Sequence, residues 1–257
     1  IIRIKQLIRR SVWALTKQME KGDFRPSGYE MKFGSGKIDR IDICEDEGTI
    51  YVKVTDYKTG MKSFDITAFY HGLQLQLPVY LNAAMEMERK KHSDETIVPA
   101  GIFYYRMKDP IVEKEKNDTV LEEKLLKELK LDGLINAEET VLQHLERDLS
   151  GTSNLNPIGR NKDGSLSKNS KVLSPEDFEE FLLYTKQKEA ELKTAMSKGD
   201  AEAAPYELGG STGCDYCAYR DICRFDVRLD GCSYRKLEKY SSEEVLEKMR
   251  KADTKEI

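Results

Sequence analysis

The sequence predicts an α/β fold from three features: strand-like alternation, helical periodicity and size. β-forming residues recur at every second position on both sides of a polar stretch at 45–48, which ends in glycine and indicates a turn. Later segments repeat apolar residues at helical spacing. With 257 residues, 39% of them hydrophobic and 34% charged, the chain can bury a substantial core. We expect one domain over 1–257, with a core at about 22–200 and a cysteine segment and tail at about 201–257.

The first expected elements are a helix over 1–21 and a β-hairpin within 30–58. The helix is amphipathic, with one face marked by Ile4, Leu7, Ile8, Val12 and Leu15. The hairpin register assumed here pairs Ile43 with Ile50, Ile41 with Val52 and Asp39 with Val54. Because side chains alternate with period two, these six residues share one face, and Asp56 and Lys58 continue it.

This face is apolar except at one end, where Asp39, Asp56 and Lys58 meet. In this register Asp39 and Asp56 are diagonal neighbours, roughly 7–8 Å apart at Cα, and a metal ion would bridge their carboxylates. A slip of one residue would send Asp56 and Lys58 to the face opposite Asp39. Mg²⁺ prefers carboxylate oxygens and lowers the pKa of bound water, while a lysine steadies a pentacovalent phosphate. The three groups predict phosphodiester cleavage; solvated strand ends beside a surface lysine are the alternative.

The middle of the chain predicts a helix or a kinked pair of helices over 66–91. Its apolar positions at helical spacing are Leu73, Leu77, Tyr80, Leu81 and Ala84. Pro78 should kink or interrupt this helix, because proline lacks a backbone N–H. Ile102–Met107 is a short aromatic segment, which we expect to be the third strand of the sheet.

The remaining segments predict helices separated by loops. Helices are expected at 119–130 and 137–149 around Asp132-Gly133, from Ser174-Pro175-Glu176-Asp177 to about Lys198, and from Ser241-Ser242-Glu243-Glu244. Residues 150–171 are rich in glycine, serine and asparagine and predict a loop. This loop is locally basic, so it either contacts DNA or is simply solvated.

Six motifs in combination resemble a known nuclease family. They are G-K-I-D-R-I-D from Gly36, V-T-D-Y-K-T-G from Val54, Q-x-x-x-Y at 76–80, P-A-G-I-F-Y-Y-R-M-K-D-P at Pro99–Pro110, N-K-D-G-S-L-S at Asn161–Ser167 and C-D-Y-C-A-Y-R-D-I-C at Cys214–Cys223. Over roughly Tyr29–Asp226 the chain resembles the RecB-family nuclease domain of the PD-(D/E)XK superfamily, and most closely its AddB type. The resemblance implies a restriction-endonuclease-like mixed sheet flanked by helices, and a Mg²⁺-dependent deoxyribonuclease in which Mn²⁺ can substitute.

The resemblance also assigns roles to individual residues. In that family the acid of G-x-I-D and the D-x-K pair bind metal and cut DNA, which implies these roles for Asp39, Asp56 and Lys58. By the same resemblance, the backbone carbonyl of Tyr57 is a further metal ligand. Glu30 corresponds to the upstream acid of the family and is a candidate metal ligand.

The Q-x-x-x-Y motif places Gln76 and Tyr80 on one helix face, four residues apart. In the family these residues lie beside the active site, where they contact DNA or orient the catalytic lysine. The alternative is a helix packed over the sheet with a buried Tyr80. Gln74 offers a competing polar position two residues earlier.

Five cysteines are present: Cys44, Cys214, Cys217, Cys223 and Cys232. The C-x2-C-x5-C spacing of Cys214, Cys217 and Cys223 indicates zinc or an iron–sulfur cluster, each of which normally needs four ligands. The resemblance implies the last three ligands of a [4Fe–4S] cluster, whose first cysteine lies far upstream. The chain opens with Ile1 inside a helical pattern, so we expect a fragment with an incomplete cluster and free thiols. We expect Cys44 to pack in the core, and Cys232 is a possible substitute ligand.

Charge and motif content limit the function further. The net charge of −4 argues against a broad nucleic-acid-coating surface but not against a nuclease. No apolar run approaches the roughly 20 residues of a membrane span and no signal peptide is visible, so we expect a cytoplasmic protein without a membrane partner. No Walker A motif is visible, so the chain has no ATPase of its own. The resemblance implies two partners, DNA and an AddA-like helicase/nuclease subunit in double-strand-break repair.

Three rival functions remain open. The first is a catalytically silent nuclease fold kept for DNA or partner binding, although Asp39, Asp56 and Lys58 are all intact. The second is a Cas4-like exonuclease, which shares the D-x-K core and a cysteine cluster. The insert at Asn161–Ser167 and the C-terminal extension favour the AddB type. The third is a zinc-stabilised interaction domain organised by the cysteines.

Overall fold

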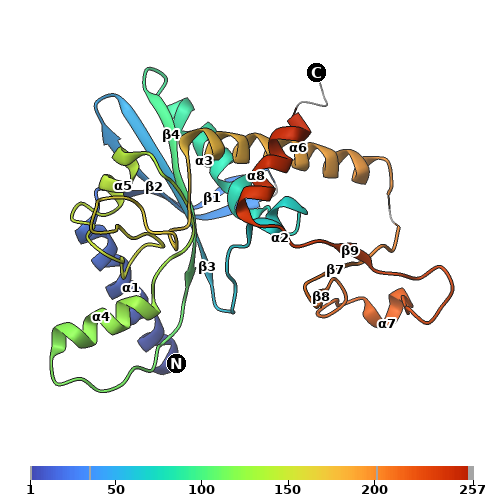
Figure 1. The fold of residues 1–257 in the computed structure, drawn as a ribbon, viewed down its shortest axis with the longest axis horizontal. Helices are drawn as coiled ribbons and strands as arrows, with labels where there is room; N and C mark the ends of the chain where they lie inside the picture. Colours follow the sequence, from blue (N-terminus) through green and yellow to red (C-terminus); the bar gives the residue numbers. More distant parts are fainter. Residues whose placement is uncertain (1, 35, 201, 254–257) are drawn as a thin grey trace. The chain divides into compact units, whose positions relative to one another are not determined.

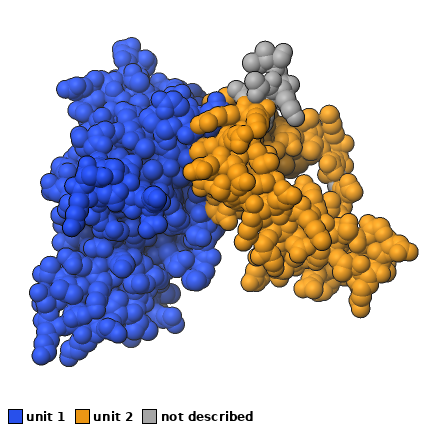
Figure 2. Space-filling view, in the orientation of Figure 1, with its two compact units in different colours: residues 1–64, 76–182 blue, residues 65–75, 183–257 orange. Residues whose placement is uncertain are grey.

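The computed structural model describes residues 2–34, 36–200 and 202–253. The described chain divides into two compact units. Unit 1 comprises Ile1–Phe64 and Gln76–Leu182, and unit 2 comprises Asp65–Leu75 and Leu183–Ile257 (Figure 2). The domain limits expected from the sequence stay a prediction.

Within its described residues, unit 1 is built around a six-stranded mixed sheet in the order β1-β2-β3-β4-β5-β6 (Figure 1). Its strands are β1 Arg25–Phe33, β2 Gly36–Asp46, β3 Thr49–Lys58, β4 Thr96–Arg106, β5 Asp132–Asn136 and β6 Val172–Leu173. Strands β1, β2 and β3 are antiparallel neighbours, β4 is parallel to β3, β5 is antiparallel to β4, and β6 is parallel to β5. Its helices are α1 Ile2–Lys21, α3 Gln76–Lys91, α4 Asp118–Glu128, α5 Glu139–Leu145 and the start of α6 Pro175–Ser197. The predicted mixed sheet flanked by helices is confirmed.

The β2–β3 hairpin turns at Glu47-Gly48, where φ is 43° and 78°. A two-residue turn with two positive φ values matches the right-handed twist of the strands it joins. Consequently Ile41 faces Val54. The predicted pairing of Ile41 with Val52 was wrong by two residues, because it assumed a longer turn at 45–48. An offset of two residues preserves the alternation of side chains, so the predicted face is retained.

Strand β1, which extends this hairpin to three strands, was not predicted. It pairs with β2, with Tyr29 facing Arg40. Its ladder is irregular between Pro26 and Gly28, and Glu30 has a left-handed φ of 53°. A bulge and a left-handed residue break the period-two alternation, so the sequence carries no clear strand signal there.

The sheet separates two buried layers. Helices α1, α4 and α5 pack on one face. The core there includes Ala14, Phe24, Cys44, Tyr51, Phe103, Tyr105, Leu129, Val141, Leu142 and Leu145, and Leu126 of α4 packs against it. By strand alternation, the other face carries Ile41, Val52, Val54 and Ile102. Helix α3 covers this second face, since it contacts β2, β3 and β4 (Figure 1). The predicted catalytic residues belong to the face under α3.

The segment predicted at 66–91 forms a pair of helices, α2 Ile66–Tyr70 and α3. The prediction that Pro78 kinks or interrupts this helix was wrong. Pro78 is the third residue of α3, which continues beyond it. In the first turn the backbone N–H groups have no intrahelical partner, so proline costs no hydrogen bond there. The helix therefore begins at Gln76.

Strand β4 confirms a strand at the segment predicted, Ile102–Met107, but it begins earlier, at Thr96. It lies directly beside β3 and is the fourth strand of the sheet, not the third as predicted, because β1 precedes the hairpin. Strand β5 was not predicted, because Asp132-Gly133 was placed between two expected helices. A Cβ atom at Gly133 would lie 1.9 Å from the carbonyl oxygen of Ile102, so the glycine permits close strand approach. Helices α4 and α5 confirm the two helices expected on either side.

The described part of unit 2 contains the helices α2, the rest of α6, α7 Arg220–Cys223 and α8 Ser242–Asp253. It also contains a small sheet that was not predicted, formed by β7 Tyr206–Leu208, β8 Ser211–Thr212 and β9 Arg235–Leu237. The predicted helix starts are confirmed. The backbone N–H of Asp177 donates to Ser174 Oγ at 3.1 Å, and that of Glu244 donates to Ser241 Oγ at 3.2 Å. None of the helices described here has the length and hydropathy to span a bilayer.

Candidate active site

The predicted site residues lie on three elements of unit 1. They are Asp39 on β2, Asp56 and Lys58 at the end of β3, and Gln76 and Tyr80 in the first turns of α3. The antiparallel ladder ends at the pair of Arg40 with Thr55, so Asp39 and Asp56 are the next residues beyond its end, and the Asp39 charge acts on Asp56. The two carboxylates are therefore neighbours, and the predicted diagonal relationship was wrong for the same reason as the register.

A polar network joins β3 to α3. Lys58 Nζ lies 2.6 Å from Asp56 Oδ2 and donates a hydrogen bond to Gln76 Oε1 at 3.0 Å. Gln76 Nε2 donates to Asp56 Oδ1 at 3.0 Å and to the Tyr80 hydroxyl at 2.8 Å. One amide thus accepts from the lysine and donates to the carboxylate, which fixes both side chains. The competing Gln74 instead accepts a hydrogen bond from the backbone of Asp65 at 3.2 Å.

The backbone of β3 holds Asp39. The N–H of Tyr57 donates to Asp39 Oδ2 at 2.9 Å. The Tyr57 ring lies on the opposite face of the sheet, edge-on to Tyr105 with ring centroids 6.0 Å apart. The backbone N–H of Tyr57, which lies between Asp56 and Lys58, therefore binds Asp39, while the Tyr57 side chain packs on the other face of the sheet. The proposed metal contact of the Tyr57 carbonyl stays a prediction.

Asp56 is almost completely buried, with 2% of its surface exposed. Burial raises the pKa of Asp56, the Lys58 ammonium lowers it in part, and the neighbouring Asp39 charge raises it further. Apart from this ion pair with Lys58 Nζ at 2.6 Å, Asp56 Oδ2 has no hydrogen-bond partner among the described residues. The site thus contains an acceptor whose charge is incompletely compensated.

This donor set fits a hard divalent cation such as Mg²⁺. Two neighbouring carboxylates are the ligand type that Mg²⁺ prefers, and Asp56 Oδ2 has no partner among the described residues besides the Lys58 ammonium. Within the described ranges, no three Asp, Glu, His or Cys side chains lie close enough together to hold a metal ion. The remaining ligands would therefore be backbone or water oxygens, and Mg²⁺ characteristically keeps several waters.

Glu30 lies on β1, opposite Asp39 in the register of β1 with β2. Its carboxylate forms an ion pair with Lys37, and its side chain is 61% exposed. The role of Glu30 as a metal ligand stays a prediction.

Two site neighbours were not predicted from the sequence, Tyr104 and Lys62. Tyr104 pairs with Asp56 in the parallel β3–β4 ladder, and its hydroxyl is buried without a hydrogen-bond partner among the described residues. Burial and the Asp56 charge raise the pKa of Tyr104. The ammonium groups of Lys58 and Lys62 lie 5.7 and 5.2 Å from the Tyr104 ring centroid. The strand signal at Ile102–Met107 could have indicated Tyr104, whereas Lys62 lies in a connection without periodicity.

The three clustered cysteines belong to unit 2. Cys214 is partly exposed, while Cys217 and Cys223 are exposed, and all three are free thiols. In the described part of the chain they do not come together as a metal-binding group, so this arrangement does not fit a [4Fe–4S] cluster or zinc as it stands. Cys44 is buried in the core beneath the opposite face, which confirms its predicted packing role.

The fold and the sequence define a family. The chain matches the PD-(D/E)XK nuclease superfamily over residues 2–224 and belongs to it. The mixed sheet, with the D-x-K pair at the end of β3, is consistent with that fold.

Curated relatives make the resemblance more specific. The chain is 36% identical to the AddB subunit of the ATP-dependent helicase/deoxyribonuclease of Alkaliphilus metalliredigens over 279 aligned residues, covering 100% of this chain and 24% of the relative. It is 36% identical to the corresponding protein of Lachnoclostridium phytofermentans (98% and 23% covered) and 34% identical to that of Clostridioides difficile (98% and 24%). The chain thus spans about a quarter of the length of these relatives, and the expected AddB-type similarity is confirmed.

Proposed function

We propose that this chain is a metal-dependent DNA nuclease domain that hydrolyses phosphodiester bonds at Asp39, Asp56 and Lys58. The observation that carries the proposal is the network in which Gln76 joins Lys58 to the buried Asp56, opposite Asp39. A solvated strand end has no need of a buried carboxylate tied to a lysine. The superfamily match and the relatives' name support DNA cleavage.

Asp39 and Asp56 would hold the ion, preferably Mg²⁺ with Mn²⁺ as a substitute. When bound, such an ion neutralises charge on a phosphate oxygen and lowers the pKa of a bound water. The Lys58 ammonium, 2.6 Å from Asp56 Oδ2, would orient the attacking water and stabilise negative charge on phosphorus. Gln76 fixes the lysine, and Tyr80 in turn receives a hydrogen bond from Gln76. Both would keep the lysine aligned with the carboxylate.

The relatives' name supports a cellular role for the longer protein. We propose that the chain serves an AddB-like subunit that degrades DNA exonucleolytically during double-strand-break repair and recombination in the cytoplasm. Its partner would be an AddA-like helicase/nuclease, which supplies the ATP-dependent activity that this sequence lacks. A [4Fe–4S] cluster on Cys214, Cys217 and Cys223 would need a fourth ligand and a rearrangement of this segment.

Digestion of single-stranded DNA tests the proposal. Wild-type protein should degrade the DNA with Mg²⁺ or Mn²⁺ and not with EDTA, and Asp56→Ala should abolish degradation. Asp94→Ala, a change at an exposed aspartate in a turn, should leave the rate unchanged. Degradation by wild type and Asp56→Ala alike would indicate a contaminating nuclease. Degradation by neither folded protein would favour the catalytically silent scaffold, and so contradict the proposal.

A further inference from the structure

Lys62 places a second ammonium group at the candidate site. It lies four residues after Lys58, in the connection that leaves β3. Its Nζ is 5.2 Å from the ring centroid of Tyr104, and Lys58 Nζ is 5.7 Å from the same centroid. Tyr104 pairs with Asp56 in the β3–β4 ladder, Lys58 contacts the buried carboxylate directly, and the Asp56 charge also acts on Lys62.

The connection that carries Lys62 is anchored two residues later. The backbone N–H of Phe64 donates to Asp132 Oδ2 at 2.7 Å. The Phe64 ring is buried and lies edge-on to Phe181, with centroids 6.1 Å apart. Asp132 itself pairs with Tyr104 in the β4–β5 ladder, so the anchor and the site share one row of the sheet. Lys62 therefore lies between the end of β3 at Lys58 and the anchor at Phe64.

The charge of Lys62 is left without a partner anion. Among the described residues Lys62 forms no ion pair, and Asp56 is already engaged by Lys58 and Gln76. Partial burial and the Lys58 charge lower the pKa of Lys62, and Asp56 offsets only part of this effect. Two like charges held beside one ring indicate a binding partner that brings negative charge.

We propose that Lys62 binds a phosphate of the DNA backbone at or next to the scissile bond. This inference rests on the proposed nuclease function. Two carboxylates, two ammonium groups and one divalent ion sum to two positive charges, which match the two negative charges of a pentacovalent phosphate. A lysine is a compact cation and binds phosphate without sequence preference. Lys62 therefore contributes to every cleavage event regardless of sequence.

The experiment compares Lys62→Ala and Lys62→Arg with Lys130→Ala. Thermal unfolding first confirms that each variant is folded. Lys130 is a matched control, because it is also partly buried and its pKa is also lowered by burial. Cleavage of single-stranded DNA is measured with Mn²⁺. Binding of the same DNA is measured with Ca²⁺ over a range of salt concentrations.

We expect Lys62→Ala to lower kcat/KM roughly 10- to 100-fold, the effect of one charge-assisted hydrogen bond. We also expect it to reduce the slope of log affinity against log salt by about 0.7, the value for one phosphate of a single strand. Lys62→Arg should restore most of both properties, and Lys130→Ala should match wild type.

If Lys62→Ala has the same kcat/KM and the same salt slope as wild type, the inference is overturned. The lysine would then only pack its alkyl chain against Tyr104. If wild type binds DNA but cleaves none, the proposed function fails, while the salt slope still decides the role of Lys62. Wild type that neither binds nor cleaves DNA overturns both.

Discussion

Lys58 and Asp56 lie on one face of β3 with Nζ and Oδ2 2.6 Å apart, and only 2% of the Asp56 surface is exposed. Burial of a carboxylate costs free energy that a single lysine offsets incompletely, as the raised pKa of Asp56 indicates. A protein tolerates such a cost where function requires it. The predictions below test whether a divalent ion and DNA are the reason for it.

Gln76 should be a positioning residue for catalysis. Its amide accepts from Lys58 and donates to Asp56, so Gln76→Ala should lower kcat about 10-fold or more while KM changes little. The matched control is Gln74→Ala, which removes an amide of the same chemistry that contacts Asp65 instead. Steady-state cleavage of single-stranded DNA measures both. Equal losses in the two variants would contradict the positioning role.

Asp56→Asn should stabilise the protein when divalent ions are absent. The folded pKa of Asp56 is raised mainly by burial, so its charged form destabilises the fold above that pKa. Asparagine removes the charge, and the unfolding temperature in EDTA at pH 7 should rise by about 2 °C or more. The gain should shrink as pH falls below the raised folded pKa and should vanish below the unfolded pKa of about 3.9, because the aspartate is then neutral in both states.

Divalent ions should reverse this order of stability. An ion that binds only the folded state raises the unfolding temperature in proportion to its occupancy. Mg²⁺ or Mn²⁺ should therefore stabilise wild type and have a much smaller effect on Asp56→Asn. An identical shift in both proteins would show that the ion binds elsewhere.

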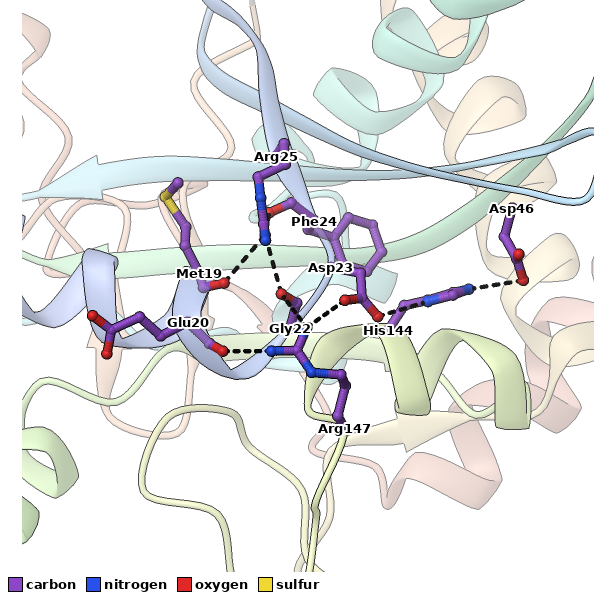
Figure 3. A network of polar contacts seen from close by, with 9 residues as sticks. All are labelled: Met19, Glu20, Gly22, Asp23, Phe24, Arg25, Asp46, His144 and Arg147. Carbon is purple, nitrogen blue, oxygen red and sulfur yellow. Dashed lines mark hydrogen bonds and ion pairs between the residues drawn. The ribbon is translucent and has the colours of Figure 1, made fainter.

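A polar cluster around Asp23 should make the fold sensitive to acid. Asp23 Oδ2 lies 3.1 Å from His144 Nδ1, Arg147 also binds Asp23, and His144 Nε2 lies 3.3 Å from Asp46 Oδ2 (Figure 3). Burial alone would raise the pKa of Asp23, but the hydrogen bonds from His144 and Arg147 outweigh it and lower that pKa. The stabilisation is therefore complete above the unfolded pKa of about 3.9 and is lost as pH falls through the lower folded pKa.

Thermal unfolding of Asp23→Asn measures this contribution. Its unfolding temperature should lie about 2 °C or more below that of wild type at pH 7, and the gap should close below about pH 4. Asp94→Asn, at an exposed position, should follow wild type at every pH. A gap that stays constant down to pH 3 would mean that packing, not charge, explains the loss.

Thiol reactivity should separate Cys44 from the other cysteines. Burial raises the pKa of the Cys44 thiol to about 11, whereas Cys217 and Cys223 are exposed. A thiol reagent at pH 8 should modify the exposed cysteines within minutes and Cys44 only after unfolding, as peptide mass spectrometry can show. Prompt modification of Cys44 in the folded protein would contradict the core packing described above.

The sequence predicted which candidate residues cluster better than it predicted the sheet around them. The D-x-K spacing and the Q-x-x-x-Y spacing are local, so Asp56, Lys58, Gln76 and Tyr80 could be placed before their neighbours were known. Helix starts at Ser174 and Ser241 were equally clear, since capping is a local property.

The errors in the sheet arose where position depends on distant partners. The hairpin register depended on a turn of two residues rather than four, and β1 is hidden by the left-handed Glu30. Gly133 was not assigned to a strand because its requirement, close approach to Ile102, comes from another strand. Lys62 and Tyr104 meet only through the parallel β3–β4 pairing, which periodicity does not reveal.

Single-turnover cleavage of DNA by Asp39→Asn, Asp56→Asn and the double variant tests the central claim most directly. If both carboxylates hold one ion, each single change should slow cleavage about 1,000-fold or more, and the double variant should be no slower than the worse single variant. The shared metal site would be contradicted if each folded single variant cleaves within about tenfold of the wild-type rate and the two losses multiply in the double variant.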